Sequence, residues 1–292
     1  MNAIELTDVC KSFGRKKVLE KLDLTVPAGS VYAFLGRNGA GKSTTIKMLA
    51  GQLQPDAGTV RVLGLDPAAD AVELRRRTGY VAENQALFND LSLREYCGFV
   101  AKFHTDYNAA LGESLIKRFE LPTELKLGKF SRGMYSKAAL IGVLARSPRL
   151  LILDDPTLGL DTVARREFID ILRDTLLDFE HTLFISSHIL HELEGFCDHA
   201  GILRDGRMVA AGEIDRLKSE HFTISLAETV LPPPFPGEIS RRKNPGELRI
   251  FLCGDRAETA RKLQEQAIAP FTVNALTLED IFIEYAGKEE TE

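Results

Sequence analysis

The chain has 292 residues, of which 44% are hydrophobic and 27% charged, and its formal net charge is −5. This composition is ordinary for a globular protein with enough apolar material for a core, and the length suits one main domain with an appendage. The slightly acidic balance argues against nucleic acid as a partner, and no apolar run approaches the roughly 20 residues of a membrane-spanning helix.

Four cysteines lie far apart in the chain, without the C-x-x-C spacing of a metal site or redox motif. We expect them to be small, buried, free thiols of a reducing compartment. The four are Cys10, Cys97, Cys197 and Cys253.

The first third of the chain is predicted to be rich in strands. Residues 3–9 and 22–26 alternate apolar and polar side chains, as half-buried strands do. Residues 31–35 form a short apolar run that is typical of a fully buried strand. Further on, the pattern predicts a helix over 45–50 and a strand over 59–64.

A complete phosphate-loop motif, G-x-x-x-x-G-K-[ST], lies between the strand at 31–35 and the following helix. Its glycines allow successive N–H groups to point into one concavity, which makes an anion nest. Lys42 can reach the β- and γ-phosphates of a nucleotide, and the Ser43 hydroxyl can ligate Mg²⁺. We therefore predict nucleotide binding by this loop, with these candidate contacts: Gly36, Asn38, Gly39, Ala40, Gly41, Lys42, Ser43 and Thr44.

The middle of the chain, from about 92 to 146, is predicted to be mostly helical, with Ser131 at a helix N-cap. After it the pattern becomes strand, helix, strand, which is typical of a parallel sheet. The predicted elements are a strand at 150–153, a helix at 163–179, a strand at 182–185, a helix at 190–197, and a hairpin of 200–203 with 208–210.

The last quarter has no phosphate chemistry and contains a proline-rich break at 232–237. A strand at 248–252 and helices at 257–266 and 278–285 predict a small α+β appendage. We therefore divide the chain into a domain of residues 1–217, with a helical subdomain at about 84–146, and a small C-terminal domain of residues 218–292.

A phosphate loop needs a second acidic anchor for Mg²⁺ at the end of a neighbouring buried strand. Four apolar residues at 150–153 end in Asp154, which places this carboxylate at the carboxyl edge of the sheet, where ligands of α/β proteins bind. The sequence therefore predicts Asp154 as a metal ligand.

Several ordered motifs over about residues 1–217 resemble those of the nucleotide-binding subunits of ABC transporters. The segment 130–134, Phe-Ser-Arg-Gly-Met, looks like the signature motif L-S-G-G-Q, and 154–161 looks like the Walker B and D-loop segment. The resemblance implies an α/β phosphate-loop ATPase core with a mixed or parallel sheet, an antiparallel β subdomain, a helical subdomain and a C-terminal α+β appendage.

The resemblance also implies roles for individual residues. Phe13 would stack on adenine, although an ordinary core position is the alternative. His188 would donate to the γ-phosphate, and Asp161 lies in the D-loop. The signature residues Ser131, Arg132 and Gly133 would face ATP on a second subunit, so that a homodimer or a pair with a paralogous subunit sandwiches two ATP molecules.

The chain departs from the family pattern at three places. In the signature, Arg132 replaces the usual first Gly and Met134 the Gln. Asp155 stands where a catalytic Glu is usual; because a misplacement of about 1 Å can cost about 10²-fold in rate, we expect slow hydrolysis. Glu83 stands at the position of a Gln that contacts Mg²⁺ and water; Gln85 is a weaker candidate, and a solvated loop residue is the alternative.

The function that the sequence predicts is thus that of an ATP-hydrolysing subunit, with ATP and Mg²⁺, that powers a separate transmembrane permease from the cytoplasmic face of the membrane. The segment 276–285 is similar to that of subunits paired with exporters, and the surface from Glu83 to 92–95 is the expected docking region. The alternative is a soluble ABC-type ATPase acting on nucleic acid or ribosomes. A phosphate-loop GTPase would need an N-K-x-D guanine reader, which the sequence lacks.

Overall fold

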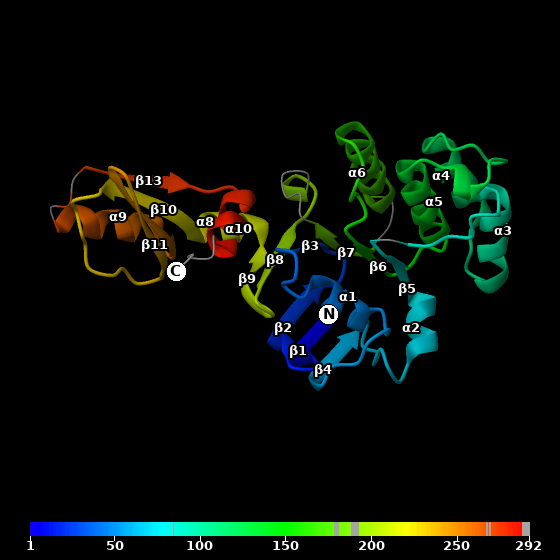
Figure 1. The fold of residues 1–292 in the computed structure, drawn as a ribbon, viewed down its shortest axis with the longest axis horizontal. Helices are drawn as coiled ribbons and strands as arrows, with labels where there is room; N and C mark the ends of the chain where they lie inside the picture. The colour runs from blue at the N-terminus through cyan, green and yellow to red at the C-terminus, as the bar shows by residue number, and fades with distance from the viewer. Residues whose placement is uncertain (84, 178–180, 188–192, 267, 269, 288–292) are drawn as a thin grey trace.

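The computed structural model describes residues 1–83, 85–177, 181–187, 193–266, 268 and 270–287. These residues form three sheets, and the helical segment and the C-terminal sheet lie at opposite ends of an elongated molecule (Figure 1). His188 and most of the predicted helix at 190–197 lie outside the described residues.

The central sheet has the strand order β5-β6-β7-β3-β8-β9. Its inner strands are parallel and fully or almost fully buried, which is why they are continuous apolar runs in the sequence. Only β9 runs antiparallel, after a turn in which Asp205 and Gly206 both have positive φ. The strands are β3 (Val31–Gly36), β5 (Thr78–Val81), β6 (Leu150–Asp154), β7 (Thr182–Ser187), β8 (His199–Arg204) and β9 (Arg207–Glu213).

A second, antiparallel sheet has the order β2-β1-β4, with β1 (Asn2–Phe13), β2 (Lys16–Pro27) and β4 (Ala57–Val62). Its alternating pattern buries one face, including Ile4 and Leu24, against α1 (Lys42–Leu49). This packing holds the antiparallel sheet beside the strand that leads into the phosphate loop.

The helical segment follows β5 and returns to β6. Ser92 begins its first long helix with a capping box, in which its side chain and that of Glu95 each bond the other's backbone N–H. Ser131 caps the last helix, as predicted. The elements are α2 (Ala71–Arg77) before β5, then α3 (Leu93–Phe103), α4 (Ala109–Arg118), the short 3-10 helix η1 (Leu127–Lys129) and α5 (Arg132–Leu144).

The C-terminal sheet has the order β11-β12-β10-β13 and a hydrophobic cluster of its own, which includes Phe222, Ile250 and Leu263. Its strands are all antiparallel to their neighbours. The elements from β6 onward that complete the fold are α6 (Thr162–Leu177), α8 (Ile214–Glu220), β10 (His221–Ala227), β11 (Glu238–Asn244), β12 (Glu247–Cys253), α9 (Arg256–Glu265), β13 (Phe271–Ala275) and α10 (Leu278–Ala286).

The two parts of the chain are joined without an intervening loop, because α8 ends at Glu220 and β10 begins at His221. The boundary between 217 and 218, which stays a proposal, falls within α8. The terminal helix α10 packs back onto the main core: its residues Leu278 and Ile281 belong to the same buried cluster as Ala33 of β3.

The expected α/β class with an antiparallel subdomain, a helical segment and an α+β appendage is confirmed. The four cysteines are all free, as expected, but only two of them are buried. Cys10 and Cys253 are half-exposed, and Cys253 is the last residue of β12.

Candidate nucleotide site

The phosphate loop (residues 36–44) connects β3 to α1, in the order strand, loop, helix that the motif predicts. Gly39 and Gly41 have φ values of 83° and 114°, a region that side-chain-bearing residues rarely adopt. A Cβ at Gly41 would also lie 2.6 Å from Leu19 Cδ2. Glycine is therefore favoured at this position mainly by its backbone angle, and a side chain would also require Leu19 to shift.

The turn between β8 and β9 supports the phosphate loop from behind. The Gly206 N–H donates to the Ala40 carbonyl at 3.1 Å, and the Gly206 carbonyl accepts the Glu20 N–H at 3.0 Å. A Cβ at Gly36 would lie 2.8 Å from the Leu203 carbonyl oxygen, so the loop and β8 touch backbone to backbone. The loop is thus held by β8 and by the turn that follows it.

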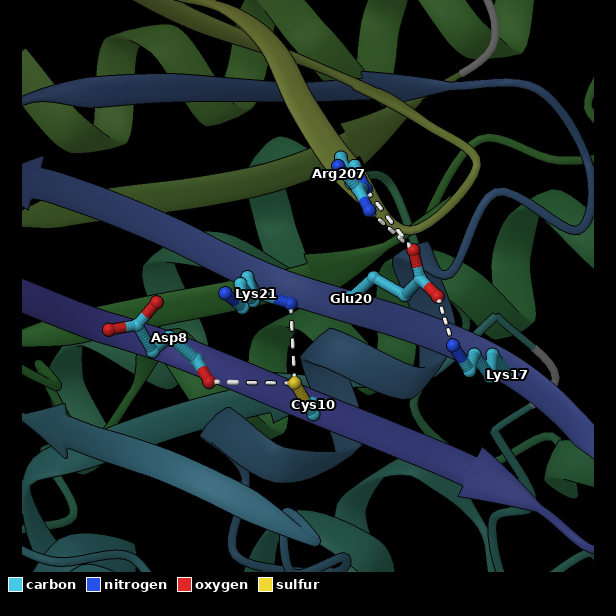
Figure 2. A network of polar contacts seen from close by, with 6 residues as sticks. All are labelled: Asp8, Cys10, Lys17, Glu20, Lys21 and Arg207. Atoms are coloured by element: carbon cyan, nitrogen blue, oxygen red, sulfur yellow. Dashed lines mark hydrogen bonds and ion pairs between the residues drawn. The ribbon is translucent and has the colours of Figure 1, made fainter.

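An ion network ties the same hairpin to β2 (Figure 2). Glu20 pairs with Arg207 of β9 at 2.7 Å and with Lys17 at 2.8 Å. Hydrogen bonds from Lys17 and then Arg207 lower the pKa of Glu20 to about 2. Beside it, the Cys10 thiol accepts the Lys21 N–H at 3.3 Å, which ties β1 to β2.

Lys42, the lysine of the motif, is buried at the start of α1, with 6% of its surface exposed. Its Nζ donates to the Gly36 carbonyl at 2.6 Å. Burial lowers the pKa of Lys42, and the charges of Asp155, Asp154 and Glu83 oppose that shift. The three carboxylates therefore offset part of the cost of burying this cation, which can meet an incoming phosphate.

Asp154 lies at the end of β6, as the sequence predicts, and only 3% of it is exposed. Its Oδ1 accepts a hydrogen bond from the Ser186 hydroxyl at 2.8 Å, and Ser43 also donates to it. Burial is the main reason that its pKa is raised; Asp155 and Glu83 add to the effect through their negative charge. Ionisation of Asp154 is thus costly when no ligand is bound, and a cation bound beside it would offset that cost.

The next residue, Asp155, adopts a left-handed conformation with φ of 43°. Its N–H donates to the Ser186 hydroxyl at 2.9 Å, and the residue lines the cavity above the loop. Backbone strain of this kind is concentrated at functional sites. Ser186 was missed as a site residue, although it directly follows the apolar run 182–185 on the strand beside β6 and could have been found from that position.

A cavity of about 630 Å³ lies over the phosphate loop. Phe13 lines it and is 52% exposed, with the Lys11 ammonium 5.7 Å from its ring centroid. The alternative of an ordinary core position is therefore wrong for Phe13. The lining residues are Phe13, Lys16, Val18, Arg37, Asn38, Gly39, Gly41, Lys42, Ser43, Thr44, Glu83, Asp155 and Leu158.

Four site candidates, Ser131, Arg132, Gly133 and Asp161, are absent from the lining of this cavity. Ser131 caps α5 by accepting the Met134 N–H at 3.2 Å, and Arg132 and Gly133 follow it in the first turn. Asp161 caps α6, accepting the N–H groups of residues 163 and 164 at 3.0 Å and 2.9 Å.

Arg132 also touches the D-loop of its own chain. A Cβ at Gly159, where φ is 75°, would lie 2.3 Å from the Arg132 Nη1. The guanidinium therefore covers the Gly159 backbone, and glycine is needed there. Arg132 lines a neighbouring cavity with Glu83 and Gln85, so Glu83 is the one residue of this group that reaches both cavities. The Gln85 side chain accepts the Ala82 N–H at 3.0 Å and is absent from the lining over the loop.

The donor set at Asp154 fits a hard cation. Carboxylate and hydroxyl oxygens of Asp154 and Ser43 meet there, and neighbouring carboxylates raise the local negative charge. Among the residues that the structure describes, no three His, Cys, Asp or Glu side chains form a closed metal cage. An open site of this kind suits Mg²⁺, which usually takes few protein ligands and completes its shell with water and phosphate.

The site combines a phosphate loop, a buried lysine and two consecutive carboxylates at the edge of a parallel sheet. This combination defines a phosphate-loop nucleoside triphosphatase. The family model described as ABC transporter matches residues 19–158. A Bacillus licheniformis protein described as "Bacitracin transport ATP-binding protein BcrA" is 36% identical over 97% of both chains. The chain therefore belongs to the ABC transporter family, in which it is an ATP-binding subunit and an ATPase.

Other relatives agree with this assignment. A Burkholderia lata protein described as "Nod factor export ATP-binding protein I" is 32% identical over 98% of this chain and 97% of its own. A solved structure titled "Structure of ATP binding subunit of ABC transporter" is 30% identical, with a TM-score of 0.68 over 74% of this chain and 92% of that one. No helix among the described residues is long and apolar enough to cross a membrane.

Proposed function

We propose that this chain hydrolyses ATP to drive a membrane exporter formed by a separate transmembrane permease, and that it acts at the cytoplasmic face of the membrane as a peripheral subunit. The observation that carries the proposal is the match to the bacitracin transport protein over 97% of both chains, which includes the C-terminal domain as well as the ATPase core. The Nod factor export protein matches over the same extent.

In this proposal the phosphate loop holds ATP with its backbone N–H groups, and Lys42 holds the β- and γ-phosphates. Phe13, exposed at the mouth of the cavity, stacks on the base. Ser43 and Asp154 hold Mg²⁺, with Glu83 close enough to influence the charge on Asp154. The ion, when bound, neutralises charge on the phosphates, and the protein residues position them.

Asp155 is proposed as the residue that orients the attacking water, and His188, which lies outside the described residues, as a hydrogen-bond donor to the γ-phosphate. Two observations support this role for Asp155: its N–H donates to the Ser186 hydroxyl, and it lines the cavity over the phosphate loop. Its side chain is one carbon shorter than the usual Glu, so the carboxylate stands about 1.5 Å short. The proposal therefore includes slow ATP hydrolysis.

Closure of two subunits around ATP completes the proposed site. Ser131, Arg132 and Gly133 are at the start of α5, where N–H groups and the helix dipole favour an anion, but they are outside the ATP cavity of their own chain. A second copy, or a paralogous subunit, would bring these residues to the phosphate. Reopening after hydrolysis would then transmit work to the permease.

The proposed docking surface for the permease is an exposed aromatic patch that begins within the expected region 84–95 and continues along α3. Phe88, Phe99 and Phe103 are 56%, 36% and 70% exposed, and the successive ring centroids are 4.8 Å apart. Within 92–95 itself, Ser92 and Leu93 are buried, so they hold the start of α3 rather than a partner. The aromatic patch is also linked to the signature helix, because the Tyr135 hydroxyl of α5 bonds the Leu87 backbone.

Two measurements test this function. The tagged chain, purified from detergent-solubilised membranes of its own cell, should bring down an integral membrane protein, and Phe103→Asp should reduce that yield while ATP binding is kept. ATPase activity should be competed by ATP analogues more strongly than by GTP. Recovery of ribosomes or nucleic acid in place of a membrane protein would instead support the alternative of a soluble ATPase acting on those partners.

A further inference from the structure

The C-terminal end of α10 lies directly against the phosphate loop. Arg37, the second residue of the loop, donates from Nη1 to the Gly287 carbonyl at 3.2 Å. Arg204, at the end of β8, donates from Nη1 to the Tyr285 carbonyl at 3.0 Å. In Figure 1, α10 (red) stands between the C-terminal sheet and β8. The helix therefore connects that sheet to the ATP loop.

The C-terminal sheet holds the same helix end from the other side. Arg242 of β11 donates to the Glu284 carbonyl at 3.5 Å and pairs with the Glu284 carboxylate at 3.3 Å. Arg249 of β12 pairs with the other carboxylate oxygen of Glu284 at 3.1 Å. Glu284 is buried, so it depends on these partners.

Together Arg37, Arg204 and Arg242 form a three-arginine clamp on the last turn of α10 and its C-cap residue, Gly287. The last carbonyls of a helix have no partner within the helix, and they carry the negative end of its dipole. The last turn of α10 contains no basic residue of its own. The cations that satisfy this end therefore come from the phosphate loop, β8 and β11.

Packing reinforces the connection. Leu278 and Ile281 of α10 are fully buried in the same cluster as Leu35 of β3 and Ile202 of β8. Strand β3 leads into the phosphate loop, and β8 ends at the turn that supports it. A displacement of α10 would therefore disturb both elements that hold the loop.

We propose that α10 positions the phosphate loop for ATP, with Arg37 and Arg204 as positioning residues, so that the C-terminal domain sets the affinity of the ATP site. This inference rests on the proposed role of the phosphate loop in holding ATP. Whatever shifts the C-terminal sheet would change ATP affinity through the clamp, without any contact between that sheet and the nucleotide.

The test is an equilibrium titration of the full-length chain with ATP, combined with ATPase kinetics. Arg204→Ala and Arg242→Ala, which are absent from the ATP cavity lining, should each weaken ATP binding by about threefold to tenfold, since these charge-assisted hydrogen bonds are partly exposed. The rate at saturating ATP should change little, and Arg204→Lys should restore part of the affinity. The matched control is Arg94→Ala, which removes an exposed ion pair with Glu124 in the helical segment, at the opposite end of the molecule from the C-terminal sheet.

The outcomes separate this inference from the proposed function. If Lys42→Ala leaves ATP binding intact, the proposed loop function fails. If Lys42→Ala removes binding but Arg204→Ala and Arg242→Ala leave it unchanged, the positioning role is overturned. A loss confined to Arg37→Ala would mean direct contact with ATP and would also overturn it. Should Arg204→Ala fail to fold, ATP binding by Arg204→Lys and hydrogen exchange of its residues 36–44 would decide whether Arg204 positions the phosphate loop.

Discussion

Ser186 and Asp154 are paired positions on the neighbouring parallel strands β7 and β6, and the Ser186 hydroxyl donates to Asp154 Oδ1 at 2.8 Å. The same hydroxyl accepts the Asp155 N–H at 2.9 Å. One hydroxyl thus fixes the Asp154 carboxylate and the backbone of the next residue, Asp155. Because strand register sets Ser186 opposite Asp154, the hydroxyl that holds both groups comes from the sheet itself.

Ser186→Ala should lower both stability and ATPase activity. It leaves the buried Asp154 carboxylate and the Asp155 N–H without this partner, at a cost of about 1–3 kcal/mol in the free energy of unfolding. Thermal unfolding and the ATPase rate at saturating ATP would measure the two effects. Ser219→Ala, which removes a hydroxyl bond to the Arg216 carbonyl on the surface, is the control and should change neither.

Asp154→Asn should raise the melting temperature of the nucleotide-free protein while it lowers ATPase activity by about 10²-fold or more. Burial raises the pKa of Asp154, so the folded state holds its proton more tightly than the unfolded chain. The free energy of unfolding therefore falls as pH rises through the raised pKa of Asp154, because the buried carboxyl group must ionise. A neutral amide at this position avoids that cost at neutral pH. A melting temperature that falls at pH 7.5 would contradict this account.

Asp56→Asn is a control for which we expect the opposite change in melting temperature. The pKa of Asp56 is lowered, first by a hydrogen bond from Lys11 and then by the Ser12 N–H. Its contribution is present above its ordinary pKa and is lost as pH falls through the lowered value. The amide should therefore lower the melting temperature slightly at neutral pH, where Asp154→Asn raises it.

Asp155→Glu should increase the rate of ATP hydrolysis, by up to about 10²-fold, because it moves the carboxylate about 1.5 Å further toward the phosphates. ATP affinity should change little, since Lys42 and the loop N–H groups are untouched. Single-turnover kinetics would separate hydrolysis from product release. A slower variant would mean that the positive φ of Asp155 already positions its shorter side chain correctly.

Phe13→Ala should weaken ATP binding by about 1–3 kcal/mol, the usual value of one base-stacking contact, with almost no change in melting temperature because the ring is exposed. Phe88→Ala is a matched control, since Phe88 is similarly exposed but lies in the aromatic patch. It should keep ATP affinity and reduce permease binding. Titration of both variants with ATP distinguishes a role in base stacking from a role in permease binding.

Glu20→Gln should destabilise the protein at pH 7 but not near pH 2. Hydrogen bonds from Lys17 and Arg207 lower the Glu20 pKa to about 2, against an ordinary value of 4.5. The stability contribution is therefore complete above pH 4.5 and lost as pH falls through about 2. Melting temperatures of the variant and the parent should converge across this window; a constant difference would point to lost packing instead.

The sequence predicted well those elements whose own pattern determines them. The apolar runs at 31–35, 150–153 and 182–185 are buried parallel strands, and the hairpin at 200–210 turns at Asp205 and Gly206 as expected. The helix at 163–179 is observed to Leu177, the last residue described before the gap.

Other elements depend on tertiary contacts and were missed. β5 has only four residues and is a strand because β6 pairs with it. β11 is largely polar and only partly buried, and its pairing with β12 is what makes it a strand. In the site, Arg37 could not be distinguished by sequence, since the motif allows any residue there and its partner, Gly287, is 250 positions away.

Because α10 completes the main hydrophobic core, the ATPase part of this chain is not an interchangeable module. A chain cut after residue 217 would expose the surfaces of β3 and β8 that Leu278 and Ile281 cover. A loss of ATPase activity in this shortened chain would then be caused by an incomplete fold, and not by the removal of a regulator. Domain exchange with a relative should accordingly carry α10 together with the strands on which it packs.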